Sequence, residues 1–168
     1  MTTPVRVPVL SLRRASALLV AVSVAGLLGG CAASSWLGFK GDKVKWKQVT
    51  LTAAADANGN SPVAVDVVLV SDEALQARLA DLPAAKWFAG RSDLGSTYPS
   101  GLRYRSWELV PGQRLDVPAE DLEGPRVAAA YVFANYQAPG AHRARVEQFN
   151  GTLAVQLDSA AFTVLVTK

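Results

Sequence analysis

Few side chains in this sequence are of the types that carry out catalysis. The chain has one histidine, His142, which follows Pro139-Gly140 at the start of a predicted strand. No Gly-x-Ser-x-Gly sequence is present, so a nucleophile elbow has no support. A lone histidine beside a turn is more often an exposed turn residue than the base of a catalytic triad. We therefore expect no enzymatic activity, and a hydrolase that uses His142 is the alternative to test.

A second candidate is a short run of possible oxygen ligands for a metal ion. Asp56-x-Asn58-x-Asn60 resembles the start of a calcium-binding loop. The pattern fails further on, because Ser61 occupies the sixth position, where glycine is needed, and Val67 the twelfth, where a bidentate glutamate is needed. The sequence thus predicts no metal site and no cofactor.

The third candidate is acidic. Glu120, Asp121 and Glu123 cluster in one segment, residues 118–125. Such a run is usually a solvated loop. The alternative function that it suggests is a binding module for a small ligand, or an inhibitor of an envelope enzyme.

The only cysteine, Cys31, follows an apolar run and two glycines. The run from Ala15 to Leu28 lacks charge and is shorter than the roughly 20 residues that span a bilayer. It ends in small residues and the lone cysteine, which resembles the cleavage and lipidation site of bacterial lipoproteins. The resemblance implies a signal peptide over residues 1–30 and a mature chain that starts at Cys31, carrying a diacylglycerol and an acyl group such as palmitate. An uncleaved membrane anchor is the alternative. The basic start of this signal consists of Arg6, Arg13 and Arg14.

Removal of the signal changes the charge balance. The whole chain has 17 Lys and Arg against 14 Asp and Glu, and the three signal arginines account for the whole excess. No electrostatic case for nucleic acid binding survives. The mature part, at about 140 residues, is long enough for one domain. We expect a tether over residues 31–43 and a single domain over residues 44–168.

The hydrophobic pattern of that domain has mostly a period of two residues, which is typical of strands. The strand over 63–70 is apolar on both faces except at Asp66, so both faces should be covered. Residues 53–62 contain Asn-Gly and end in proline, which predicts a loop between the first two strands. The other predicted strands are 44–52, 102–110, 114–117, 126–136, 143–149, 152–158 and 162–167.

One segment has a helical period instead. Leu75, Leu79 and Leu82 predict a helix that Ser71 caps, and Asp81 caps a second short helix that should end at Gly90. Residues 91–101 are expected to be loop. Farther on, Asn150-Gly151 lies between two strand-like runs, which is the strongest short signal for a hairpin. Together these features predict an all-β fold, a two-sheet antiparallel sandwich with a short helical insertion after the second strand.

The order of these features resembles the TssJ family, the outer-membrane lipoproteins of bacterial type VI secretion systems. The residues that carry the resemblance are Val49-Thr50-Leu51-Thr52, Asn58-Gly59-Asn60-Ser61-Pro62, the strand Val63 to Leu69, Trp87-Phe88, Leu109-Val110-Pro111-Gly112 and the apolar strand Val127 to Phe133.

The resemblance implies a transthyretin-like sandwich attached by lipid to the outer membrane and facing the periplasm. Ala32 and Ala33 after the cysteine fit an outer-membrane sorting pattern. The resemblance also implies that the partner is an inner-membrane secretion protein, TssM, whose periplasmic C-terminal region binds the loop between the first two strands. By position, the partner-binding residues in this chain are Ala54, Ala55, Asp56, Ala57, Asn58, Gly59, Asn60 and Ser61.

Overall fold

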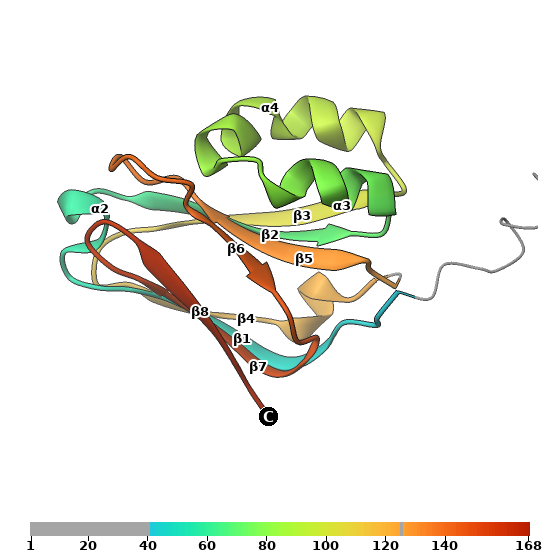
Figure 1. Cartoon of the computed structure of the whole chain (residues 1–168). Helices are drawn as coiled ribbons and strands as arrows, with labels where there is room; N and C mark the ends of the chain where they lie inside the picture. Colours follow the sequence, from blue (N-terminus) through green and yellow to red (C-terminus); the bar gives the residue numbers. More distant parts are fainter. Residues whose placement is uncertain (1–40, 125) are drawn as a thin grey trace, which may run out of the picture. The chain divides into compact units, whose positions relative to one another are not determined.

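The computed structural model describes residues 41–124 and 126–168, which form two four-stranded sheets and a layer of helices (Figure 1). This confirms the predicted all-β sandwich. The predicted signal peptide and Cys31 lie outside the described residues. The first sheet has the order β4-β1-β7-β8 and consists of Arg114–Val117, Lys45–Ala53, Asn150–Leu157 and Phe162–Thr167. The second has the order β3-β2-β5-β6 and consists of Leu102–Leu109, Val63–Val70, Ala129–Ala134 and Arg143–Val146.

Strand β2 has both faces covered, as the sequence predicts. Its side chains alternate between two cores because neighbouring residues of a strand point to opposite faces. Val65 and Val67 pack toward the other sheet, in what we call the sheet–sheet core. Val68 and Val70 pack toward the helices, in what we call the sheet–helix core. All four side chains are fully buried.

Two helices follow β2 and cover the outer face of its sheet (Figure 1): α3, Glu73–Ala80, and α4, Ala84–Thr97. The predicted cap at Ser71 is wrong, because the Asp72 carboxylate accepts the Leu75 amide at 2.7 Å. The predicted end of the second helix at Gly90 is also wrong. Helix α4 continues for two further turns. Among the described residues, no helix is long and apolar enough to cross a membrane.

The hairpin predicted at Asn150-Gly151 does not form. Strand β6 pairs with β5 in one sheet, whereas β7 lies between β1 and β8 in the other. The residues before Asn150 cross between the sheets, and their carbonyls are taken by β1: the Lys45 amide donates to Phe149 O at 2.6 Å, and Trp46 Nε1 to Gln148 O at 2.9 Å.

Gly151 is required for a different reason. Its φ is +88°, and a Cβ at this position would collide with the carbonyl oxygen of Thr167 in the neighbouring strand. The Asn-Gly signal therefore marks a close approach of β8 to β7 rather than a two-residue turn. The sandwich is also not wholly antiparallel, because β1 and β7 run parallel.

Candidate functional site

Four connections between strands meet at one end of the sandwich, on the left in Figure 1. They are the β1–β2 loop, residues 54–62, the β3–β4 turn, 110–113, the β5–β6 loop, 135–142, and the β7–β8 turn, 158–161. We call this end the loop face. Residue 41 enters at the opposite end, and the nine-residue strand β1 separates the two by about 30 Å.

The β1–β2 loop folds into one tight turn rather than an open connector. Its short element α2, Ala57–Asn60, is left-handed at Asn58, Gly59 and Asn60, with φ of 49°, 63° and 62°. Asparagine and glycine are the residues that tolerate this backbone region. The Asn-Gly-Asn sequence therefore fixes the shape of the loop.

Asn58 ties this loop to the rest of the loop face. Its side chain is 3% exposed, its amide nitrogen donates to Pro62 O at 2.8 Å, and its amide oxygen accepts the Gln137 N–H at 2.8 Å. The backbone amides of Asn58 and Gly59 both donate to the β7–β8 turn, at Asp158 O and Ser159 O. Asn58, which belongs to the calcium-loop-like pattern in the sequence, therefore has a structural role in this loop.

The structure divides the eight loop residues named above by exposure. Asn58 and Ala57 are buried, so their side chains hold the loop and do not face solvent. Ala54 and Ser61 are half-buried. The side chains or backbone that reach solvent belong to Ala55, Asp56, Gly59 and Asn60.

The loop face includes surface residues that the sequence analysis did not connect with the β1–β2 loop. Val110, 53% exposed, Gln137 and Asp158 lie on the three other connections. The order of the predicted strands would have placed these residues together. Consecutive strands of a sandwich reverse direction, so every second connection lies at the same end. For the same reason β1 and β7, both odd in that count, are parallel when they pair.

Tyr136 and His142 brace the β5–β6 loop. The Tyr136 hydroxyl donates to Ala161 O at 2.6 Å, and its ring stacks on the imidazole with centroids 4.8 Å apart. Burial raises the pKa of Tyr136 to about 12. His142 is half-buried, and its Nε2 lies 2.7 Å from Ala138 O. The expectation of an exposed turn histidine is therefore wrong, because this imidazole packs within the loop.

Charge is sparse on the loop face. In its four connections the only charged side chains are the exposed Asp56 and Asp158. The other exposed residues of these connections are alanines, glycines, prolines and amides, together with Val110 and Ser159. Among residues 41–124 and 126–168, no three His, Cys, Asp or Glu side chains are placed to hold a metal ion.

The acidic segment lies at the other end of the molecule. It forms a 3-10 turn, η1, Ala119–Leu122, with Leu122 buried beneath it. Its backbone rather than its carboxylates is held by the sheet: Arg103 Nη1 donates to Glu123 O at 2.6 Å and Arg105 Nε to Asp121 O at 3.1 Å. The structure therefore separates this segment from the β1–β2 loop.

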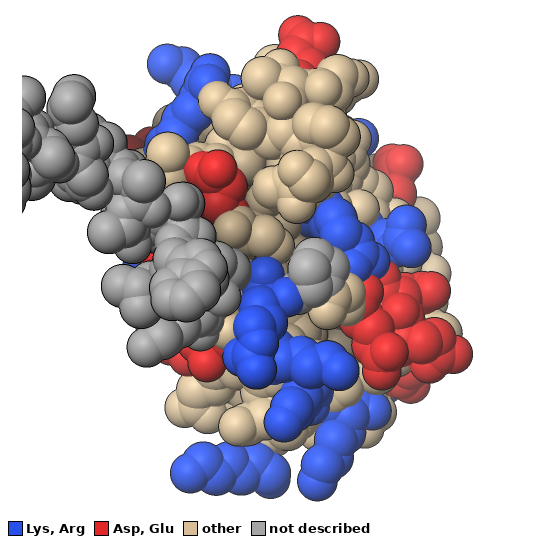
Figure 2. All heavy atoms as spheres, turned by 90° about the vertical axis from the view of Figure 1, so that its right-hand side faces the viewer, with Lys and Arg blue, Asp and Glu red and all other residues tan. Residues whose placement is uncertain are grey.

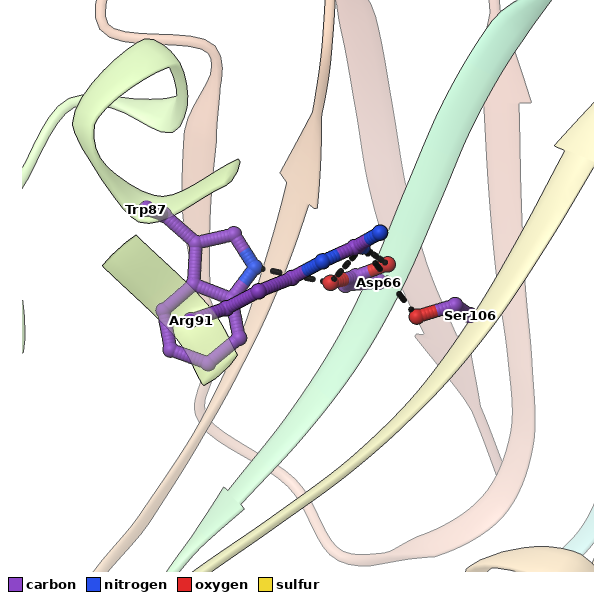
Figure 3. Close-up of polar contacts among 4 residues, drawn as sticks. All are labelled: Asp66, Trp87, Arg91 and Ser106. Atoms are coloured by element: carbon purple, nitrogen blue, oxygen red, sulfur yellow. Dashed lines mark hydrogen bonds and ion pairs between the residues drawn. The ribbon is translucent and has the colours of Figure 1, made fainter. Parts of the chain in front are cut away.

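One buried ionic cluster was not anticipated (Figure 3). The Asp66 side chain is 0% exposed, and its carboxylate accepts from Trp87 Nε1 at 2.8 Å and from Arg91 Nη1 at 2.6 and 2.8 Å. The same Arg91 nitrogen lies 3.2 Å from Ser106 Oγ. All the carboxylate contacts come from α4, so this cluster fixes the helix on the sheet.

The fold, two sheets with helices on the outer face of one, is that of lipoproteins from type VI secretion systems. The type VI lipoprotein TssJ1 from Pseudomonas aeruginosa has a TM-score of 0.54 and 18% identity, over 75% of this chain and 98% of that one. A chain in a type VI membrane complex has a TM-score of 0.54 and 17% identity, over 74% and 98%.

Lip from Serratia marcescens, described as a membrane bound component of the type VI secretion system, has a TM-score of 0.50 and 14% identity, over 71% of this chain and 96% of that one. No protein-family model matches the chain, and no curated protein matches its sequence. The three likenesses, at 18% identity or less, establish the fold. They agree with the fold that the resemblance in the sequence implied.

Proposed function

We propose that this chain is a TssJ-family lipoprotein, a non-enzymatic component of a type VI secretion membrane complex. Lipid on Cys31 attaches it to the outer membrane, and its domain faces the periplasm. The loop face binds the periplasmic C-terminal region of an inner-membrane protein of the TssM kind.

The observation that carries this proposal is the shared fold. The likeness extends over 98% of the TssJ1 chain and 75% of this one, so it is not limited to a few strands of a common sandwich core. The residues on which the sequence resemblance rests all lie in the part of the chain that the structure describes. The lone Cys31 after an apolar run, which suits lipidation, supports the same assignment from outside the described residues.

The chemistry of the loop face supports the choice of binding surface. The centre of a protein interface is depleted of charged residues, and this face has two carboxylates with small and amide side chains between them. Its backbone is already ordered by the contacts of Asn58. A preorganised loop loses little conformational entropy on binding, which favours affinity.

A binding assay tests this surface. The intact lipoprotein is titrated with the periplasmic domain of the TssM-like protein, and Ala55→Arg with Asp56→Arg is compared with Ala74→Arg and Ala77→Arg on α3. All four positions are exposed. Two arginines in the interface should weaken binding by at least about tenfold, which is about 1.4 kcal/mol, and those on α3 should not. Equal affinities would remove the loop from the proposal.

Substitution is preferable to deletion of residues 56–61. Deletion would remove Asn58, leave the Gln137 N–H without its acceptor and confuse loss of binding with loss of structure. Neutralisation of the acidic segment by Glu120→Gln and Glu123→Gln is the third arm. Binding lost only in that arm would favour the small-ligand or inhibitor alternative.

A separate experiment tests the anchor. Cells that produce the wild-type chain or Cys31→Ser are grown with a radioactive fatty acid. Label is expected in the wild type and not in the variant, because the cysteine sulfur and the amino group released at it are the acylated atoms. Label that persists in Cys31→Ser would contradict the proposed anchor.

A further inference from the structure

The end of the domain where residue 41 enters differs in charge from the loop face. Figure 2 views this end, where Lys and Arg side chains gather beside a group of acidic side chains. A shallow hollow there is lined by four cationic and two acidic side chains, from Lys43, Lys45, Arg126, Lys168, Asp42 and Glu147. We call this surface the entry face.

The cations of the entry face are available for a partner. Lys43, Lys45 and Lys168 are exposed, and within the described residues none of the three forms an ion pair with a carboxylate. Arg126 is also exposed, and its Nη1 donates to Gly41 O at 2.8 Å. This bond places one cation beside the point at which the chain enters the domain.

We propose that the entry face lies against the phosphate groups of the membrane to which the chain is attached, and that this contact points the loop face away from the membrane. The inference rests on the proposed lipid on Cys31. The nine residues from Ala32 to Lys40 can extend no farther than about 35 Å, so an anchored chain holds this basic surface near the headgroups.

The cations around the point where the chain enters select the orientation. Each lysine or arginine near an anionic surface strengthens binding about fivefold, and the acidic segment with Glu120, Asp121 and Glu123, although it lies at the same end, does not line the hollow. The loop face has only Asp56 and Asp158 as charged side chains and would be repelled. A durable acyl anchor makes the cations unnecessary for attachment itself. The cations instead set the orientation of the domain on the membrane. The length of β1 then places the loop face about 30 Å from the membrane surface.

The test uses the full mature lipoprotein in lipid nanodiscs with a fluorophore on an introduced cysteine. Cys31 is the only native cysteine, so a lipidated chain has one reactive thiol. The probe sits either at exposed Gln148, which lines the entry face, or at exposed Ala160 on the loop face, as Gln148→Cys or Ala160→Cys. Quenching by spin-labelled headgroups is measured in discs of zwitterionic lipid and in discs with about a quarter phosphatidylglycerol, which supplies the anionic charge.

Quenching of the probe at 148 should be about fivefold greater in the anionic discs. It should fall to the zwitterionic level near 1 M NaCl, where the Debye length is about 3 Å. The probe at 160 should remain unquenched. Lys43→Glu with Lys45→Glu should abolish the effect, and the matched reversals Arg78→Glu with Lys86→Glu, exposed on the helices, should not.

Three results would overturn the inference: equal quenching at 148 in both kinds of disc, quenching that survives Lys43→Glu with Lys45→Glu, or preferential quenching at 160. Mass spectrometry of the same preparation separates the two proposals. A chain without the acyl mass overturns both, whereas an acylated chain whose probe ignores anionic lipid overturns this inference and leaves the proposed function standing.

Discussion

Strand β2 supplies alternate side chains to the sheet–sheet core and the sheet–helix core, and the two cores are held together differently. The sheet–sheet core is aliphatic for most of its extent and, in the part of the chain that the structure describes, encloses no buried charged side chain. The sheet–helix core is rich in aromatic rings, with Trp87 stacked on Phe133 at 5.0 Å, and it encloses the carboxylate of Asp66.

The difference has a physical origin. Several chain connections join the two sheets, and strand pairing fixes the register within each sheet. Apolar packing alone can therefore align one sheet on the other. A helix on a sheet is free to slide and rotate by comparison. The bonds from Trp87 and Arg91, one turn apart on α4, to a single carboxylate fix both its position and its rotation. We therefore expect the sheet–helix core to depend on a few polar contacts.

The largest effect should come from Arg91→Ala. Removal of one member of a buried ion pair costs about 3–5 kcal/mol, because the other charge stays buried without compensation. Here Asp66 would remain fully buried and Arg91 is mostly so, at 31% exposure. Urea unfolding measures the change. The control is Arg114→Ala, whose pair with Asp116 is more than half exposed on both sides and should contribute little.

A triple variant sharpens this comparison. Asp66→Leu with Trp87→Phe and Arg91→Met replaces the two charges and the indole N–H that bonds to the carboxylate by apolar groups, and such replacements are often neutral for stability. A triple variant as unstable as Arg91→Ala would show that the cluster contributes net stability rather than alignment.

The second prediction uses adjacent residues of β2. Val67→Ala and Val68→Ala each remove two buried methyl groups and should each cost about 2 kcal/mol. Val67 packs between the sheets and Val68 beneath the helices. Hydrogen exchange should therefore show lost protection in both sheets for Val67→Ala, but mainly in α3 and α4 for Val68→Ala. The same exchange pattern for both variants would mean that the two cores unfold as one.

The same contrast explains how much of the fold the sequence predicts. The hydrophobic pattern predicts β2, β4 and β8 with the bounds that the structure has. Two conditions favoured these strands: side chains that alternate or are uniformly apolar, and turn residues at both ends. Such local signals are sufficient for the presence of a strand but do not determine its partner. For that reason Asn150-Gly151, a hairpin signal in isolation, is a close approach between strands in the fold.

The helical layer was harder to predict because contacts with the sheet, rather than local sequence preferences, stabilise its helices. Gly90 and Gly95 each disfavour a helix by about 1 kcal/mol, and the sequence alone places Arg91 in a loop. In the structure, the ion pair of Arg91 with Asp66 and the burial of Leu94 outweigh that cost. The sequence shows Asp66 as an exception in an apolar strand. Its partner Arg91 was not predicted, because the predicted helix ends at Gly90.

For the loop face, the position of the β1–β2 loop was predictable, whereas the burial of Asn58 depends on the distant Gln137.

The third prediction compares two buried tryptophans, one from each core. Trp87 Nε1 donates to the carboxylate of Asp66, and Trp46 Nε1 donates to the backbone carbonyl of Gln148, at 2.8 and 2.9 Å. A hydrogen bond to a charged group contributes about 1.5–3 kcal/mol and a neutral one about 1 kcal/mol. Trp87→Phe should therefore destabilise more than Trp46→Phe in urea unfolding. Equal losses would indicate that only ring packing matters at both positions.

The smallest expected effect on stability involves two buried tyrosines, and it appears only at high pH. Burial raises the pKa of both Tyr131, beneath α3, and Tyr136, on the loop face, the latter to about 12. The unfolded chain loses these protons near pH 10, whereas the folded chain keeps them to higher pH. Stability should therefore be full below about pH 10 and fall between about pH 10 and 12, because the unfolded state then binds fewer protons.

Phenylalanine variants assign that loss to one region or the other. The Tyr136 hydroxyl donates to Ala161 O at 2.6 Å and the Tyr131 hydroxyl to Gln76 O at 3.2 Å. Unfolding midpoints in urea are compared near pH 8 and pH 11, on either side of the ordinary tyrosine pKa of about 10. The difference between the two midpoints should shrink in Tyr136→Phe and, to a smaller extent, in Tyr131→Phe. A shift of the same size in the wild type and in both variants would assign the alkaline sensitivity to other groups. A larger reduction in Tyr131→Phe than in Tyr136→Phe would show that the helical layer is the first region to lose stability at high pH.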